Sequence, residues 1–301
     1  MLLKTRSIPR KIHYYNALHN RTPLSDNQRE DYHTHFKGYE GEKQFIRLLS
    51  EFPDAVVLWD LTFRSKYKGM AQFDIIVIHG NTVTHYDIKN YKGIFTMNDR
   101  LLVNSYGRNF KNPDDQLSRA HHILEDVIAQ SGERYIIESY LVFINEYFHL
   151  RSNNDNPRWL FRSMVHSHLK KFREPNLLIE DNKSLGSYFL AANMPELDFN
   201  PIERSEFSMQ MKGMKCLHCN YMIKAITSRT KYHTCTNCGS STAIKRITFH
   251  NLRDLYHLKG DAFTINEAME WCCGISRASI SRVLAEHFKK TGLSKATKYY
   301  L

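Results

Sequence analysis

Residues 73–89 predict the β-hairpin at the centre of the fold, with the sequence Phe73-Asp74-Ile75-Ile76-Val77-Ile78-His79-Gly80-Asn81-Thr82-Val83-Thr84-His85-Tyr86-Asp87-Ile88-Lys89. The apolar, β-branched first half predicts a strand buried on both faces. Gly80-Asn81 is a two-residue turn signal, so the second half returns antiparallel to the first. Counting outward from this turn places Asp74 directly opposite Asp87.

The two aspartates create an electrostatic problem. Opposed residues in a hairpin have Cβ atoms about 4.5–5.5 Å apart, and two carboxylates at that distance repel each other. A hard divalent cation would compensate, together with Lys89, which shares a face with Asp87. The alternative is a pair of aspartates at frayed strand ends that form surface salt bridges with Lys89 and Lys92.

A helix is predicted before the hairpin, over residues 43–52. Its buried stripe consists of Phe45, Leu48, Leu49 and Phe52. Glu42 lies three residues before Phe45 and faces the same side, where a carboxylate is costly unless a positive group meets it. The alternative is a glutamate favoured by the dipole of the helix N-terminus.

A second helix is predicted after the hairpin. Asn112 can cap it and Pro113 suits its first position. Gln116 shares a face with Ala120 and Ile123, so we expect it to point inward. The alternative is an ordinary polar residue near a helix start. Residues 140–144 predict the next buried strand.

These segments together resemble the nuclease-related (NERD) domain of the PD-(D/E)xK phosphodiesterase superfamily. The resemblance covers about residues 37–150 and rests on the following motifs: Gly38-x-x-Gly41-Glu42, Gln72-Phe73-Asp74, Asp87-Ile88-Lys89-Asn90-Tyr91-x-Gly93 and Asn112-Pro113-Asp114-Asp115-Gln116. It implies an α/β fold with a restriction-endonuclease-like mixed sheet flanked by helices. One departure is Asp87, where the superfamily often has Glu but also accepts Asp.

The resemblance also implies roles in phosphodiester hydrolysis. Mg²⁺ or Mn²⁺ held by Asp74 and Asp87 would activate water and neutralise phosphoryl charge, and Glu42 would complete or support the metal shell. Lys89 would hold the attacking water or the developing oxyanion. Gln116 would orient the site or contact the substrate backbone.

Four cysteines predict a separate metal site. Cys216-x-x-Cys219 and Cys235-x-x-Cys238 are separated by 15 residues, the arrangement of a zinc ribbon with a tetrahedral S₄ site. A closed shell of four thiolates is structural, since it leaves no position for catalysis. A redox dithiol is the weaker alternative, without a thioredoxin-like context. Cys272-Cys273 is interpreted as a pair of buried small apolar residues.

The C-terminal segment is predicted to be helical. Thr264 and Glu267 form a capping box, Gly274 ends that helix, and Ser276 caps the next one over residues 277–289. This arrangement resembles a helix-turn-helix. The alternative is a plain helical hairpin.

Charge and composition limit the class of protein. With 42% hydrophobic residues among 301, the chain is neither disordered nor, without a run of about 18 apolar residues, a membrane protein. Its net charge of +11 favours nucleic acid as the partner. We find no secretory signal, so we expect a cytoplasmic protein.

We therefore expect four parts: a basic N-terminal arm (1–36), the NERD domain (37–200), the zinc ribbon (210–246) and a helical, helix-turn-helix-like tail (247–301). The expected function is a metal-dependent nuclease, with DNA favoured as substrate and with ribbon and tail aiding nucleic-acid binding. The main alternative is a catalytically inactive nuclease fold that binds nucleic acid or regulates. A third hypothesis is a zinc-ribbon regulator that acts through protein contacts.

Overall fold

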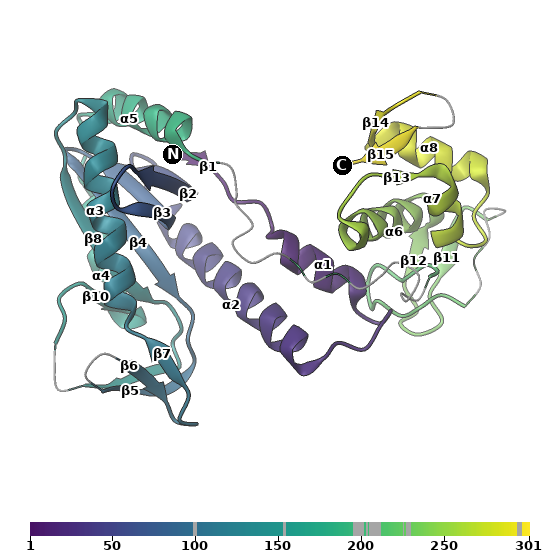
Figure 1. Ribbon diagram of the computed structural model, residues 1–301, viewed down its shortest axis with the longest axis horizontal. Coiled ribbons are helices and arrows are strands. Elements are labelled where there is room, and N and C mark those ends of the chain that lie inside the picture. Colours follow the sequence, from purple (N-terminus) through teal and green to yellow (C-terminus); the bar gives the residue numbers. More distant parts are fainter. Residues whose placement is uncertain are drawn as a thin grey trace. The chain divides into compact units, whose positions relative to one another are not determined.

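The structure is a computed structural model that describes residues 1–98, 101–152, 155–194, 202, 204, 212–224, 226, 230–293 and 297–301. The chain forms two compact units (Figure 1). Unit 1 comprises Met1–Ser7 and Phe36–Phe199, and unit 2 comprises Ile8–His35 and Asn200–Leu301. None of the described helices is long and apolar enough to cross a membrane.

Unit 1 is built on a six-stranded mixed sheet. Its order is β1-β2-β3-β4-β8-β10, with bounds β1 (Leu2–Lys4), β2 (Val56–Ser65), β3 (Gly69–His79), β4 (Thr82–Lys89), β8 (Ile136–Phe143) and β10 (Trp159–Phe161). Strands β2, β3 and β4 run antiparallel, whereas β4, β8 and β10 are parallel neighbours. This mixed sheet confirms the predicted fold class.

The central hairpin has the predicted register. His79 faces Thr82 across the Gly80-Asn81 turn, and Gly80 has a φ of +57°, a left-handed conformation that glycine adopts without strain. The β3–β4 ladder runs as far as Ile75 opposite Tyr86. Asp74 and Asp87 are the next residues outward.

Helices cover both faces of this sheet (Figure 1). On one face, α2 (Asp26–Leu49) and α4 (Arg162–Leu169) pack in one hydrophobic cluster with β2, β3 and β4. On the other, α3 (Pro113–Ser131) and α5 (Ile179–Ala192) form a second cluster with the same strands. A 3₁₀ turn (Lys170–Arg173) follows α4. Helix α2 starts at Asp26 rather than at the predicted residue 43.

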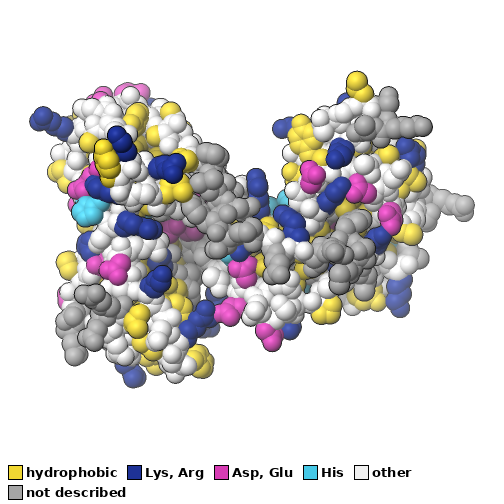
Figure 2. Space-filling model, viewed as in Figure 1, with side chains coloured by type: hydrophobic (Ala, Val, Ile, Leu, Met, Phe, Trp, Pro, Cys, Tyr) yellow, Lys and Arg dark blue, Asp and Glu magenta, His cyan; other side chains and the backbone are white. Residues whose placement is uncertain are grey.

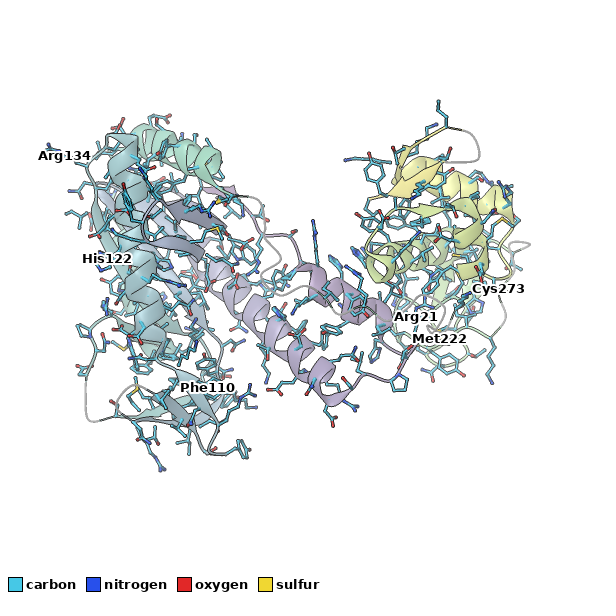
Figure 3. All side chains as sticks on the ribbon, viewed as in Figure 1. Arg21, Phe110, His122, Arg134, Met222 and Cys273 are labelled. Carbon is cyan, nitrogen blue, oxygen red and sulfur yellow. The ribbon has the colours of Figure 1, made fainter. Side chains whose placement is uncertain are left out.

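A second sheet in unit 1 was not predicted. Its order is β7-β6-β5-β9, with bounds β5 (Gly93–Asn98), β6 (Leu101–Asn104), β7 (Asn109–Lys111) and β9 (Phe148–Arg151). Phe110, labelled in Figure 3, packs with Phe95, whose ring in turn contacts Phe148. The Phe148 ring stacks on Phe143 of β8 with centroids 4.2 Å apart. Aromatic packing therefore joins this small sheet to the main one.

Unit 2 combines helices with short strands. Its elements are α1 (Arg10–Leu18), β11 (Tyr232–Thr234), β12 (Ser241–Ala243), α6 (Ile244–Lys259), β13 (Phe263–Thr264), α7 (Ile265–Trp271), α8 (Arg277–His287), β14 (Lys289–Thr291) and β15 (Lys298–Tyr300). A three-stranded antiparallel sheet has the order β13-β15-β14. The predicted helical tail is present as α6, α7 and α8, and three short strands that were not predicted complete it.

Residues 1–36 do not form the expected arm. Residues 2–4 form β1 at the edge of the main sheet, and α1 buries its apolar face in the core of unit 2. Tyr14, Ala17 and Leu18 are almost fully buried there. The segment is polar on average, but its apolar residues recur at helical spacing and therefore gather on one face of α1. The average composition gave no sign of this face.

A buried lysine joins α1 to the cysteine-containing segment. Lys215 Nζ donates hydrogen bonds to the carbonyls of Asn16 and Ala17 at 2.9 and 3.1 Å, in the last turn of α1. It also lies 3.1 Å from Asp254 Oδ2 on α6. Lys215 thus satisfies carbonyls that a helix end leaves free. Nearby, Arg21, labelled in Figure 3, lies over the Trp271 ring.

Two glycines of α2 provide a matched test of the packing. A Cβ atom at Gly41 would lie 2.8 Å from Asn90 Cβ and 3.2 Å from Ile144 Cγ2, whereas one at Gly38 would meet nothing within 4 Å. We predict that Gly41→Ala destabilises unit 1 by about 1–3 kcal/mol through overpacking. Gly38→Ala should stabilise it by up to about 1 kcal/mol through helix propensity. Urea denaturation measures both, and equal effects would contradict the close contact at Gly41.

Candidate functional site

The ends of β3 and β4 bring an acidic pair and a lysine together. Asp87 is buried, and its Oδ1 lies 2.6 Å from Lys89 Nζ in an ion pair. That oxygen accepts no hydrogen bond of regular geometry. Asp74 Oδ2 accepts a hydrogen bond of 2.8 Å from the backbone N–H of Ile88. The predicted neighbours thus share one end of the hairpin.

Burial and mutual repulsion govern protonation here. Burial, followed by the charges of Glu42 and Asp87, raises the pKa of Asp74 well above its ordinary value. Burial alone would lower the pKa of Lys89, but the charges of Asp87 and Asp74 outweigh it and raise the pKa. Lys89 is therefore cationic, and Asp74 retains its proton to an unusually high pH.

Glu42 is buried and is held by two donors. Arg6 Nη1 lies 2.6 Å from both carboxylate oxygens, and Trp59 Nε1 donates to Oε2 at 2.6 Å. The inward-facing Glu42 thus meets a positive group, and that group is Arg6, which the sequence reasoning missed. The sequence offered one sign of this role for Arg6, namely a basic residue just after β1. Burial raises the pKa of Glu42, and Arg6 opposes this shift.

Gln116 does not point inward as expected. The structure leaves it exposed in the first turn of α3. The buried face of this helix begins with Pro113 and Leu117 and continues through Ala120 and Leu124. This stripe is rotated slightly from the one assumed, so Gln116 lies outside it.

The three carboxylates do not form one compact ligand cluster. Within the described part of the chain, one group of three or more His, Cys, Asp or Glu residues has its ligand atoms within 4.8 Å of one another, and it is the four cysteines. Glu42 is occupied by Arg6 and Trp59. Asp74 and Asp87 remain as oxygen donors, and the buried Oδ1 of Asp87 lacks a hydrogen bond. Such hard oxygen ligands fit Mg²⁺ or Mn²⁺.

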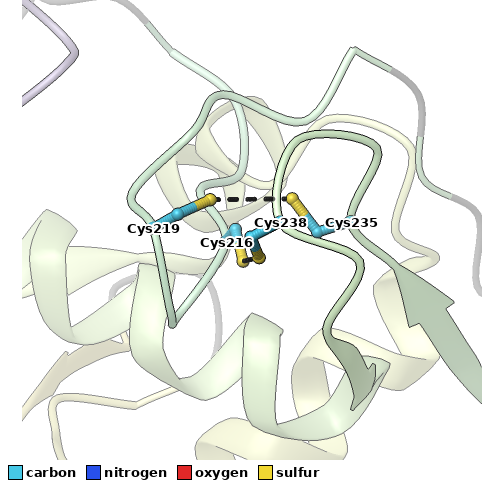
Figure 4. Close-up of side chains that lie close together, drawn as sticks. All are labelled: Cys216, Cys219, Cys235 and Cys238. Carbon is cyan, nitrogen blue, oxygen red and sulfur yellow. Dashed lines mark hydrogen bonds between the residues drawn. The ribbon is translucent and has the colours of Figure 1, made fainter.

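The four cysteines have the geometry of a tetrahedral site (Figure 4). Cys216 Sγ lies 3.8 Å from Cys238 Sγ, and Cys219 Sγ lies 3.7 Å from Cys235 Sγ. A tetrahedron with Zn–S bonds of about 2.3 Å has edges of about 3.8 Å. The backbone N–H of His218 also donates to Cys216 Sγ at 3.4 Å. The cluster can therefore hold a metal ion such as zinc.

The remaining cysteines differ from each other. Cys272 is buried as predicted, and burial raises the pKa of its thiol. Cys273 is exposed, so the prediction that both are buried is wrong for this residue (Figure 3). Helix α7 ends at Trp271 with Cys272 as its C-cap, and the backbone beyond this cap turns the Cys273 side chain outward.

Comparison with known families was made for the whole chain. The matching family model is the nuclease-related domain, NERD, and the match covers residues 37–144. Residues 37–144 form a nuclease-related domain. This NERD domain contains Glu42, Asp74, Asp87, Lys89 and Gln116, while the four cysteines lie outside it. Comparisons with curated proteins and with solved structures gave no match.

The raised pKa of Asp74 makes a prediction about stability. Below the unfolded-state pKa of about 3.9, both states hold the proton. As the pH rises further, the unfolded chain loses it first, so the ionisable residue progressively destabilises the folded state. Asp74→Asn should therefore raise the Tm of the metal-free protein, and by more at neutral than at acid pH.

Asp126 supplies a control of opposite sign. Hydrogen bonds from Lys68 and Ser65 lower its pKa, so its ionised form stabilises the folded state above the unfolded-state pKa. Asp126→Asn should not raise the Tm at neutral pH. A Tm difference between Asp74→Asn and the parent that is constant with pH would contradict the assignment.

The cysteine geometry makes a second prediction. The purified chain should carry one zinc ion per molecule, and Cys219→Ser should lose it and loosen the ribbon, because so short a segment has little core without its metal. Cys273→Ser removes an exposed thiol outside the cluster and should leave zinc unchanged. Elemental analysis of the three proteins tests this, and zinc-free parent protein would disprove it.

Proposed function

We propose that this chain is a metal-dependent nuclease that hydrolyses phosphodiester bonds in nucleic acid, with DNA favoured as substrate. The supporting observation is the buried set of Asp74, Asp87 and Lys89 on adjacent strands of a nuclease-related domain. Two close carboxyl groups beside a lysine are costly in a purely structural role. In a nuclease the two carboxylates can bind a divalent cation, and the lysine can bind the phosphate beside it.

The division of roles follows from the donor types. Asp74 and Asp87 would hold Mg²⁺ or Mn²⁺, which supplies water activation and neutralises phosphoryl charge. The Lys89 ammonium, kept cationic by its acidic neighbours, would orient the attacking water or stabilise charge on the phosphoryl oxygens. Deprotonated Asp74 is needed for metal binding, so metal affinity should increase with pH.

Glu42 and Gln116 have supporting roles in this proposal. Glu42 would position the Arg6 guanidinium through their ion pair. Because the charge of Asp74 also acts on Arg6, Glu42 would influence the acidic pair through this arginine. Gln116 is exposed, so it is free to contact the substrate backbone. Lys and Arg side chains are spread over the visible faces of both units, where they can contact phosphates (Figure 2).

The structural role of zinc completes the proposal. The four cysteines would hold Zn²⁺ in a closed sulfur shell, and the two sites should not compete strongly because one uses oxygen and the other sulfur. Ribbon and helices would aid nucleic-acid binding.

One observation favours the alternative of an inactive nuclease fold. Arg6 already neutralises Glu42, so this carboxylate is not free as a metal ligand. In that case the fold would bind nucleic acid without cutting it.

A cleavage assay separates the two functions. We predict that the parent cuts DNA with Mg²⁺ or Mn²⁺, that chelation stops it, and that Asp87→Ala abolishes it. Lys89→Ala should reduce cleavage by about 10²-fold or more, the size expected when a charged group that stabilises the transition state is removed. Lys183→Ala, which removes a lysine on α5 paired with Glu180, serves as the matched control.

Product formation by gel electrophoresis with single-stranded DNA, duplex DNA and RNA gives the readout. Cleavage by Asp87→Ala at the parent rate would remove the acidic pair from the mechanism. Binding by the parent with no cleavage of any substrate would support the inactive alternative.

A further inference from the structure

Residues 244–300 of unit 2 have the topology of a winged helix. Their elements follow one another as α6, β13, α7, α8, β14 and β15, and the small sheet has the order β13-β15-β14. Helices α7 and α8 form a helix-turn-helix, and β14 and β15 form an antiparallel hairpin directly after α8. The capping box of Thr264 and Glu267 confirms the predicted start of α7.

The turn between α7 and α8 is fixed by packing. Gly274 has a φ of +90°, and a Cβ atom there would lie 2.3 Å from the carbonyl oxygen of Ile226. The Ser276 side chain accepts a hydrogen bond from the Ser279 N–H and begins α8. Ile280, Val283 and Leu284 anchor α8 in the core. The helix is therefore rigidly held, with its opposite face in solvent.

The solvent face of α8 and the adjoining hairpin are basic. Arg277 and Arg282 are exposed, and they donate hydrogen bonds to neutral groups such as the side chains of Asn266 and Ser279. The hairpin adds three more exposed cations, Lys289, Lys290 and Lys298. No described carboxylate forms an ion pair with any of these five cations.

A groove adjoins α8. It has a volume of about 520 Å³ and lies between α8, the start of α6 and the residues before β11. Its lining residues include Lys231, Arg282, Thr230 and Ser279. Glu286 also lines it, but an ion pair with Lys245 offsets its charge. Cations and hydroxyl groups together suit the phosphate oxygens of a nucleic-acid backbone.

We propose that this winged-helix module binds duplex DNA, with α8 in the major groove and the β14–β15 hairpin on the phosphate backbone. The major groove of B-form DNA admits an α-helix, and arginine recognises guanine there with two hydrogen bonds. The major groove of A-form RNA is too deep and narrow for such an approach. Binding stands independently of catalysis, whereas duplex DNA as the substrate class of the nuclease rests on the proposed function.

Arg282 and Arg29 provide a matched pair of variants. Both are exposed arginines of unit 2, but Arg29 lies on α2, outside the winged helix, and pairs with Asp26. In the full-length Asp74→Ala background without added Mg²⁺ or Mn²⁺, cleavage cannot consume the probe. Fluorescence anisotropy would measure binding of a duplex DNA of one defined, mixed sequence and about two helical turns.

We predict that Arg282→Ala weakens duplex-DNA binding by about fivefold or more and that Arg29→Ala leaves it near the parent value. Replacing Lys289 and Lys290 by Ala should lower the salt dependence of binding by about 0.9 in log–log slope for each phosphate that the variant no longer neutralises. The parent should also bind the DNA duplex more tightly than an RNA duplex of the same sequence. Retained zinc and circular dichroism identify folded variants.

Parent-like binding by both the Arg282 and the lysine variants would overturn the proposal, as would equal or tighter binding of the RNA duplex. Absence of cleavage by the parent, with these binding results intact, would refute the nuclease proposal and leave the duplex-DNA module standing.

Discussion

Asp74 and Asp87 lie at the end of a buried hairpin, and the cost of placing two carboxyl groups there governs the side chains around them. Lys89 supplies a cation 2.6 Å from Asp87, the Ile88 N–H binds Asp74, and Asp74 retains its proton to high pH. Glu42 on α2 is a further buried carboxylate, and hydrogen bonds from Arg6 and Trp59 offset the cost of burying it. Strand β1 is required for this arrangement because it carries the chain to Arg6. The edge strand, α2 and the hairpin thus form one electrostatic unit around the candidate metal site.

Unit 2 depends on a different buried charge. Lys215 binds the carbonyls at the end of α1 and the Asp254 carboxylate on α6, so residues from both ends of the chain share one core. In sequence, the nuclease-related domain is therefore enclosed by the two segments of unit 2. Burial lowers the pKa of Lys215, and Asp254 opposes that shift. The proposed zinc site lies next to this lysine along the chain, so we expect metal binding to be coupled to the packing of α1 and α6.

The sequence allowed the hairpin, the inward Glu42, the cysteine cluster and the α7 cap to be predicted because each follows from short-range chemistry. Turn residues set the register of β3 and β4, and the spacing of Cys216 and Cys219 brings their two sulfur atoms toward one metal position. The β5–β9 sheet was missed because its strands are short and are held by aromatic contacts with β8 that are distant in sequence. Arg6 was missed because its partner Glu42 is distant in sequence. Helix α1 was missed because its segment is polar on average, although its apolar residues gather on one face. Gln116 was misplaced because a small rotation of the α3 stripe moves a first-turn residue from inside to outside.

The central claim is that Asp74 and Asp87 together form a divalent-cation site whose protonation is set by burial. The most direct measurement is calorimetric titration of Mn²⁺ into the zinc-loaded protein, in buffers of different ionisation enthalpy so that released protons are counted. We predict that Mn²⁺ binds and releases a proton at mildly acidic pH, and that Asp74→Asn abolishes the proton release and weakens binding. Parent-like Mn²⁺ affinity and proton release in Asp74→Asn, or no Mn²⁺ binding by the parent, would contradict the claim.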